Sequence, residues 1–189
     1  MICFLDMDGV IVDLATALHK RYNLPFSYHD SSYPYESGWW DIWPPKSLGM
    51  SPLEAWNDLD EDFWVNVGWT KDGPDILVYL ESIFGPENIC LLSAPTLSHS
   101  VSGKFKWIEK NLPQYLKRFL IGPAKRFCAY EDAVLIDDRD KNVEEFIDAG
   151  GQAILVPRPW NSLHHKSHIS ALEIYFVLRS LIESGAWKI

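Results

Sequence analysis

The sequence predicts an α/β protein: a three-layer, Rossmann-like domain with a mostly parallel sheet and a small helical cap inserted after the first strand. Short apolar runs alternate with helical patterns along most of the chain, and this alternation is typical of parallel strands joined by helices. An aromatic- and turn-rich segment interrupts the alternation after the first run. Polar residues follow several runs, and ligand sites in such folds lie at the carboxyl ends of the strands.

Five apolar runs are the expected strands. Each is short and almost continuously hydrophobic, as expected of strands that are covered on both faces of a parallel sheet. They comprise residues 3–5, 89–92, 119–121, 134–136 and 153–156.

Helical patterns separate these strands. Helices are expected at 10–19, 75–84, 104–112 and 142–149, and a last helix is expected to end at Gly185. Glycine–proline pairs before and after 75–84 are typical helix boundaries. In the 104–112 helix, Phe105, Ile108 and Leu112 mark the face expected to be buried, whereas Lys106 and Lys110 are expected in solvent.

The predicted domains are a catalytic core at 1–14 and 71–189 and a cap at 15–70. Within the cap, residues 51–64 resemble a helix that starts near Ser51 or Pro52. Most of the nine tryptophans lie in or beside the cap, at Trp39, Trp40, Trp43, Trp56, Trp64 and Trp69. Two interpretations stay open: these rings build a compact core for the cap, or they stack on a planar ligand such as a nucleobase.

The charge and composition of the chain limit which molecules it is expected to bind and where it is expected to be located. A formal net charge of −9 disfavours binding to nucleic acid polymers and anionic membranes but leaves room for a small phosphorylated ligand. Cys3, Cys90 and Cys128 are widely spaced and are expected to be free thiols in the cytoplasm. No apolar run approaches the ~18 residues of a membrane span, and Asp6 interrupts the first run too early for a signal peptide.

Asp6 and Asp8 follow the first strand two residues apart, an arrangement that points both side chains to one side of an extended chain. Two like charges held together need a cation or a shared proton. Asp6 is the candidate nucleophile toward a phosphoryl group, and Asp8 is placed to act as general acid and base. The plain alternative is that one of them caps the following helix.

Asp137 and Asp138 end the strand at 134–136, so they are expected beside Asp6. Together these carboxylates form an oxygen-rich site that suits Mg²⁺. The alternative is a pair of charges at a helix N-terminus.

Further candidates would bind a phosphate group. The Ser93 hydroxyl and the Ala94 backbone N–H follow the strand at 89–92, and Lys104 lies nearest the buried face of its helix. Arg139, next to the Asp137 and Asp138 pair, is a candidate for contact with the substrate, and the alternative is that it pairs with an acid. His164, His165 and His168 resemble a metal-binding tract but are expected at the surface.

The motifs DMDGV at 6–10, Ser93, Lys104 and IDD at 136–138 resemble the four motifs of the haloacid dehalogenase superfamily, in its phosphatase branch. More narrowly, DMDGVIVD, LLSAP, GKFKWIEKNL and LIDDRDKN are similar to the 5′(3′)-deoxyribonucleotidases. The resemblance implies a haloacid dehalogenase core with its cap after the first strand.

The resemblance also implies roles for individual residues. Asp6 would be the nucleophile and Asp8 the acid and base, while Ser93 and Lys104 hold phosphate. Mg²⁺ would be bound by Asp6, the backbone carbonyl of Asp8 and Asp138, with Asp137 acting through water or from outside the coordination sphere.

The resulting hypothesis is a Mg²⁺-dependent phosphomonoesterase that hydrolyses (deoxy)ribonucleoside monophosphates through an aspartyl-phosphate. The alternatives are a phosphatase of another small metabolite, a non-catalytic nucleotide-binding protein, and a structural protein that uses the tryptophan-rich segment as an interface. A homodimer is compatible with each.

Overall fold

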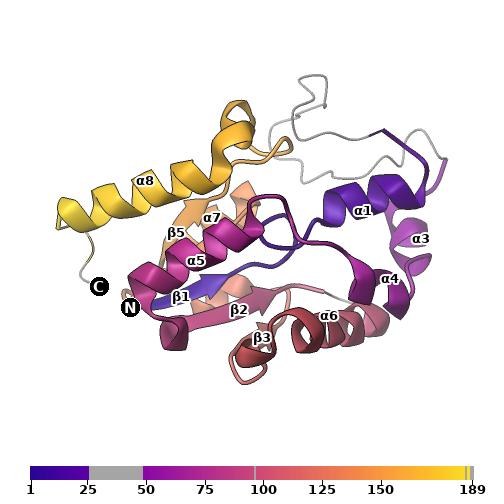
Figure 1. Ribbon diagram of the computed structural model, residues 1–189, viewed down its shortest axis with the longest axis horizontal. Helices are drawn as coiled ribbons and strands as arrows, with labels where there is room; N and C mark the ends of the chain where they lie inside the picture. The colour runs from indigo at the N-terminus through magenta and orange to yellow at the C-terminus, as the bar shows by residue number, and fades with distance from the viewer. Residues whose placement is uncertain (26–48, 96, 186, 188–189) are drawn as a thin grey trace.

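The computed structural model describes residues 1–25, 49–95, 97–185 and 187, and a five-stranded sheet forms its centre (Figure 1). All neighbouring strands pair in parallel, in the order β3-β2-β1-β4-β5. The strands are β1 (Ile2–Leu5), β2 (Ile89–Ser93), β3 (Phe119–Ile121), β4 (Ala133–Asp137) and β5 (Gln152–Leu155). The predicted fold class and the five predicted strands are therefore confirmed.

Helices cover both faces of this sheet and give three layers. The helices are α5 (Gly73–Phe84), α6 (Ser98–Asn111), α7 (Asp140–Asp148) and α8 (Ser170–Glu183). Leu5 belongs to a large cluster with side chains from α5, α6 and α8, whereas Phe4 packs with Phe146 of α7 on the opposite face. Helices α5 and α8 lie side by side in Figure 1. No helix in the described ranges is long and apolar enough to cross a bilayer.

The helix predicted at 10–19 begins later than expected. Helix α1 spans Leu14–Arg21, and the Asp13 carboxylate caps it by accepting a 3.0 Å hydrogen bond from the Thr16 backbone. The Met7 carbonyl accepts backbone hydrogen bonds from Val10, Ile11 and Val12, at 2.8 to 3.2 Å. These bonds close a tight loop after β1 in place of the first helical turn.

The described part of the predicted cap contains α1, α3 (Pro52–Asn57) and α4 (Glu61–Asn66). A capping box at Ser51 starts α3 as predicted. The single helix predicted at 51–64 is wrong, because Asp60 caps a separate helix α4 by accepting a hydrogen bond from Phe63. The predicted boundaries between core and cap stay a prediction. Trp39, Trp40 and Trp43 lie outside the described residues.

One face of α6 is docked tightly against α4. A Cβ built on Gly103 would lie 2.3 Å from the Trp64 Cβ, so only glycine permits this approach. Lys106 forms an ion pair with Glu61, and the Trp107 indole N–H donates to the Val67 carbonyl at 2.8 Å. The α4 helix and the residue that ends it are thereby fixed on α6.

The buried face of α6 differs from the prediction at one position. Ile108 and Leu112 are buried, but Phe105 is 39% exposed and Trp107 is buried instead. Phe105 rests on Phe119 of β3, with ring centroids 5.8 Å apart. Because β3 is an edge strand, it covers this ring only in part.

We expect Gly103→Ala to lower the free energy of unfolding by about 2 kcal/mol, because the added methyl must push α4 away from α6. Urea denaturation measures this loss. Gly68→Ala is the matched control, since a Cβ there meets no atom within 4 Å. An equal effect of both substitutions would contradict close packing at Gly103.

Candidate active site

The ends of three adjacent strands place their polar residues at one edge of the sheet. Asp6 follows β1, Ser93 ends β2, and Asp137 and Asp138 lie at the end of β4. Since β1 pairs with both β2 and β4, these side chains converge as the sequence predicted. This edge is where open parallel sheets bind their ligands.

Three carboxylates form a buried cluster at this edge. Asp6, Asp137 and Asp138 each offer an oxygen, and these oxygens lie within 4.8 Å of one another. Burial, reinforced by Asp137 and Asp8 and opposed by Lys125, raises the pKa of Asp6 to about 7. Burial and the nearby Asp137 and Asp6 carboxylates also raise the pKa of Asp138 well above its usual value. The cluster therefore favours a nearby cation.

Lys125 supplies one positive charge to this cluster, and the sequence analysis missed it. Its Nζ lies 2.7 Å from Asp6 and 2.6 Å from Asp137, and the residue is 4% exposed. Burial alone would lower the pKa of Lys125, but the two carboxylates raise it above its ordinary value. A lysine four residues after a predicted strand end, in GPAK, was the available signal.

The two acids at the end of β4 have different environments. Both oxygens of Asp137 are occupied by donors: Lys125, the Arg139 backbone N–H and the Asn142 amide. Asp138 accepts from the Trp160 indole through Oδ2, at 2.6 Å, while its buried Oδ1 has no hydrogen-bond partner in the described parts of the chain. Asp138 is thus the acid with an oxygen left for a ligand.

Asp8 pairs with the lysine that the sequence favoured. The Lys104 Nζ lies 2.5 Å from Asp8 Oδ2, and the Lys104 side chain is 3% exposed, whereas that of Lys106 is 51% exposed. The other Asp8 oxygen and the Ser93 hydroxyl are buried and have no hydrogen-bond partner among the described residues. Two polar atoms beside the acidic cluster are therefore left to bind a ligand.

A cavity of about 180 Å³ opens beside Asp8 and Lys104. Its other walls are mostly apolar and include Leu14, Trp56, Trp64, Ala94 and Leu97. The two tryptophan rings are stacked, with centroids 6.0 Å apart and planes inclined by 17°. The cavity thus combines a charged end with an aromatic wall.

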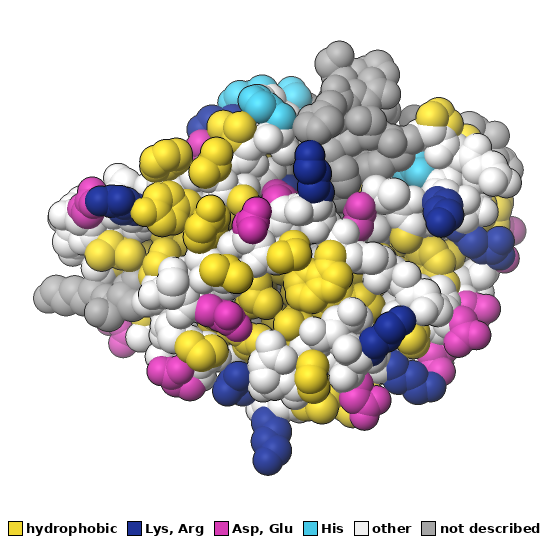
Figure 2. Space-filling view, in the orientation of Figure 1, with side chains coloured by type: hydrophobic (Ala, Val, Ile, Leu, Met, Phe, Trp, Pro, Cys, Tyr) yellow, Lys and Arg dark blue, Asp and Glu magenta, His cyan; other side chains and the backbone are white. Residues whose placement is uncertain are grey.

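Two weaker predictions fall outside this cavity. Arg139 contributes its backbone N–H to Asp137, at 2.9 Å, and is not among the cavity-lining residues in the described parts of the chain. His164, His165 and His168 are exposed, as expected. Figure 2 shows histidine side chains gathered on the surface near the start of α8.

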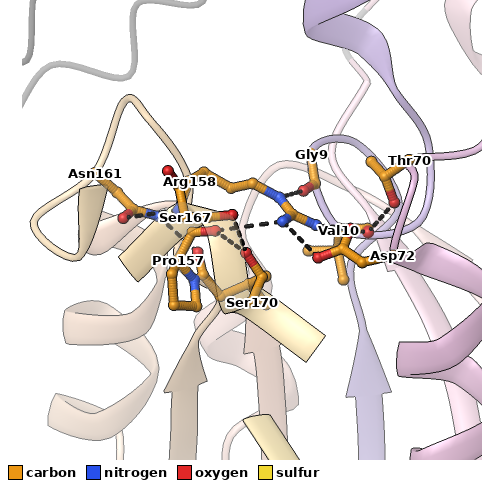
Figure 3. A network of polar contacts seen from close by, with 10 residues as sticks. Gly9, Val10, Thr70, Asp72, Pro157, Arg158, Asn161, Ser167 and Ser170 are labelled. Carbon is orange, nitrogen blue, oxygen red and sulfur yellow. Dashed lines mark hydrogen bonds and ion pairs between the residues drawn. The ribbon is translucent and has the colours of Figure 1, made fainter. Parts of the chain in front are cut away.

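A buried arginine holds the turn that follows Asp8 (Figure 3). The Arg158 guanidinium donates to the Gly9 carbonyl, and to the Val10 carbonyl at 3.1 Å. It also forms a two-pronged pair with Asp72 at the start of α5, with both distances 2.9 Å. The Thr70 hydroxyl also donates to the Val10 carbonyl, at 2.7 Å. These contacts tie the turn to the segment that leaves the predicted cap.

The family model described as 5′ nucleotidase, deoxy (pyrimidine), cytosolic type C matches residues 1–173. The chain belongs to this family. It is therefore a 5′-nucleotidase, a hydrolase that acts on phosphoric monoesters. The resemblance to the 5′(3′)-deoxyribonucleotidases is confirmed.

We expect Arg158→Met to lower the nucleotidase's free energy of unfolding by about 3 kcal/mol, because it leaves Asp72 without its cation and removes a donor from the carbonyls of Gly9 and Val10. Urea denaturation is the measurement. Arg179→Met, which removes an exposed pair with Glu183, should leave the free energy of unfolding nearly unchanged. A comparable loss in both variants would contradict a special role for Arg158.

Proposed function

We propose that this nucleotidase is a Mg²⁺-dependent phosphomonoesterase that hydrolyses (deoxy)ribonucleoside monophosphates through an aspartyl-phosphate on Asp6. The observation that carries the proposal is the buried Asp6, Asp137 and Asp138 cluster beside a cavity with an aromatic wall. The cytoplasmic location and the possible homodimer remain predictions, and the family's description as cytosolic supports the first.

The donor set suits Mg²⁺. All the candidate side-chain ligands are oxygens, the atoms that this ion prefers. Asp138 Oδ1 is buried and has no hydrogen-bond partner among the described residues. Burial, together with the neighbouring carboxylates, raises the pKa values of Asp6 and Asp138, and a divalent cation would offset the negative charge of these groups. Asp6, Asp138 and the backbone carbonyl of Asp8 would hold the ion. When bound, Mg²⁺ would neutralise charge on the substrate phosphate.

The chain's own residues would divide the reaction into two steps. An Asp6 oxygen attacks phosphorus, the bond from phosphorus to the ester oxygen breaks, and Asp8 gives its proton to the leaving oxygen. Asp8 then takes a proton from water, whose oxygen attacks the aspartyl-phosphate and releases phosphate and the Asp6 carboxylate. Lys125 orients Asp6 throughout, at 2.7 Å.

Two residues would hold the phosphate during these steps. The Lys104 ammonium lies beside Asp8, so it can share its charge between that carboxylate and a phosphate oxygen. The Ser93 hydroxyl is buried and has no partner of its own, which suits donation to a phosphate oxygen. The Ala94 backbone N–H and Arg139 are proposed as further contacts.

The cavity wall supports a nucleoside as the leaving group. Trp56 and Trp64 present aromatic surface next to the charged end of the cavity, and planar bases stack well on such rings. A sugar phosphate would leave this surface without a partner. The stacking interpretation of the cap tryptophans and the compact-core interpretation are compatible, because Trp64 also belongs to a buried cluster with α1.

The first test is phosphate release from 5′- and 3′-deoxynucleotides, ribonucleotides and sugar phosphates, with Mg²⁺ and with a chelator. We expect Mg²⁺-dependent release that is strongest from nucleotides. Asp6→Asn should lower turnover by at least about 10³-fold because the amide is a poor nucleophile. Asp148→Asn, at an exposed position of α7, is the matched control and should keep full activity.

Each other outcome selects a different hypothesis. Release from sugar phosphates alone would favour another metabolite as substrate, and full activity in the chelator would contradict the metal. Turnover by folded Asp6→Asn at the wild-type rate would exclude the aspartyl-phosphate. Binding of nucleotides without any release would favour a non-catalytic binding protein.

We further expect Trp56→Ala to reduce kcat/KM for a nucleoside monophosphate by about 10-fold or more, since base stacking on an aromatic ring contributes roughly 1–3 kcal/mol. The value for glycerol phosphate, which has no base, should stay within about twofold. Steady-state kinetics with both substrates measure the difference. Equal losses for the two substrates would show that the ring does not contact the base.

A further inference from the structure

The loop that follows β5 is unusual because it is buried throughout. Residues 156–161 are all buried, although connecting segments normally lie on the surface. None of these residues was a candidate in the sequence analysis. A loop that is buried beside a site is well placed to orient the groups of that site.

Two neighbouring side chains of this loop hold Asp138. The Trp160 indole N–H donates to Asp138 Oδ2 at 2.6 Å, and the Asn161 amide donates to the Asp138 backbone carbonyl at 2.8 Å. The remaining carboxylate oxygen, Oδ1, is buried, and no residue that the structure describes forms a hydrogen bond with it. The carboxylate is therefore held through one oxygen and presents the other to the acidic cluster.

Hydrogen bonds and an ion pair to other parts of the chain hold this loop in place (Figure 3). Arg158 joins it to the turn after β1 and to Asp72. The side-chain oxygen Oδ1 of Asn161 accepts a hydrogen bond from the Arg158 backbone N–H at 3.2 Å, and the Ser170 hydroxyl donates to the Pro157 carbonyl at 2.6 Å. The position of the Trp160 backbone is therefore fixed independently of Asp138.

The ring of Trp160 is also confined. It is 2% exposed and belongs to the cluster formed by α1 and Trp64 in the predicted cap. The Gly9 backbone packs directly against the hydrogen bond between Trp160 and Asp138. A Cβ at position 9 would lie 2.0 Å from Asp138 Oδ2 and 3.0 Å from the Trp160 ring. The indole therefore has little room to turn away from the carboxylate.

We propose that Trp160 is a positioning residue for the metal ligand Asp138, and that its indole N–H restricts this carboxylate to binding a divalent cation through one oxygen. The inference rests on the proposed Mg²⁺-dependent function. Ca²⁺ accepts bidentate carboxylates and irregular geometry, whereas Mg²⁺ and Mn²⁺ favour octahedral sites. An occupied Oδ2 therefore favours Mg²⁺ and Mn²⁺ over Ca²⁺.

The test measures metal binding without substrate or turnover. Mn²⁺ serves as the probe, because electron paramagnetic resonance reports its free concentration, and Ca²⁺ affinity follows from competition. Trp160→Phe should weaken Mn²⁺ binding by about 10-fold, as loss of a hydrogen bond to a metal ligand commonly does. Ca²⁺ binding should weaken less, so the ratio of the two affinities should fall severalfold.

Trp107→Phe is the matched control. Trp107 is equally buried and also donates its indole N–H, but its acceptor is the Val67 carbonyl. This variant should keep the wild-type affinities for both metals. A second variant carries 3-benzothienylalanine at position 160, which keeps the bicyclic ring and replaces the N–H by sulfur, and it should reproduce the effect of Trp160→Phe without leaving a void.

The outcomes separate this inference from the proposed function. Unchanged Mn²⁺ affinity in both position-160 variants would overturn the role of Trp160 while leaving the metal site in place. An equal loss of Mn²⁺ and Ca²⁺ affinity would overturn the selectivity. A wild-type protein that binds no Mn²⁺, with Asp138→Asn behaving identically, would instead overturn the metal-dependent function itself.

Discussion

The site depends on the burial of like charges at the carboxyl edge of the sheet. Asp6, Asp137 and Asp138 offer oxygens within 4.8 Å of one another, and all three are nearly inaccessible to water. Such charges are tolerated only with compensation, and Lys125 supplies part of it through Asp6 and Asp137. Lys125 contacts neither oxygen of Asp138 in the described structure. The remaining negative charge is thus concentrated where a divalent cation would bind.

Much of this arrangement could be predicted because it follows from strand ends. Asp6, Ser93 and Asp138 each follow an apolar run, and a parallel sheet necessarily brings such positions to one edge. Lys104 could be favoured over Lys106 because helical periodicity separates a buried face from a solvated one. At these four residues, the position that the sequence pattern predicts is the position that the sheet topology and the helix packing produce.

The residues that periodicity could not identify lie outside the strands and α-helices, in loops or at the start of a short 3-10 helix. Lys125 follows β3, and Arg158 and Trp160 follow β5. The local sequence pattern does not predict which part of the structure such a segment packs against. The error at residues 10–13 has a similar origin, because the bonds to the Met7 carbonyl replace a helical turn that the pattern allowed. Phe105 was misjudged because burial on α6 depends on how far the edge strand β3 extends over it.

Helix α6 contacts both the charged end of the cavity and its aromatic wall. Lys104 and Gly103 are adjacent on α6. Lys104 pairs with Asp8, and Gly103, which has no side chain, allows Trp64 of α4 to pack directly against the α6 backbone. The Lys104 ammonium also lies 5.1 Å from the centre of the Trp64 ring, on the wall of the cavity. Because α6 carries both contacts, a shift of α4 would move the aromatic wall relative to the charged end. The tight packing at Gly103 therefore holds the tryptophan wall of the cavity in place against its charged end.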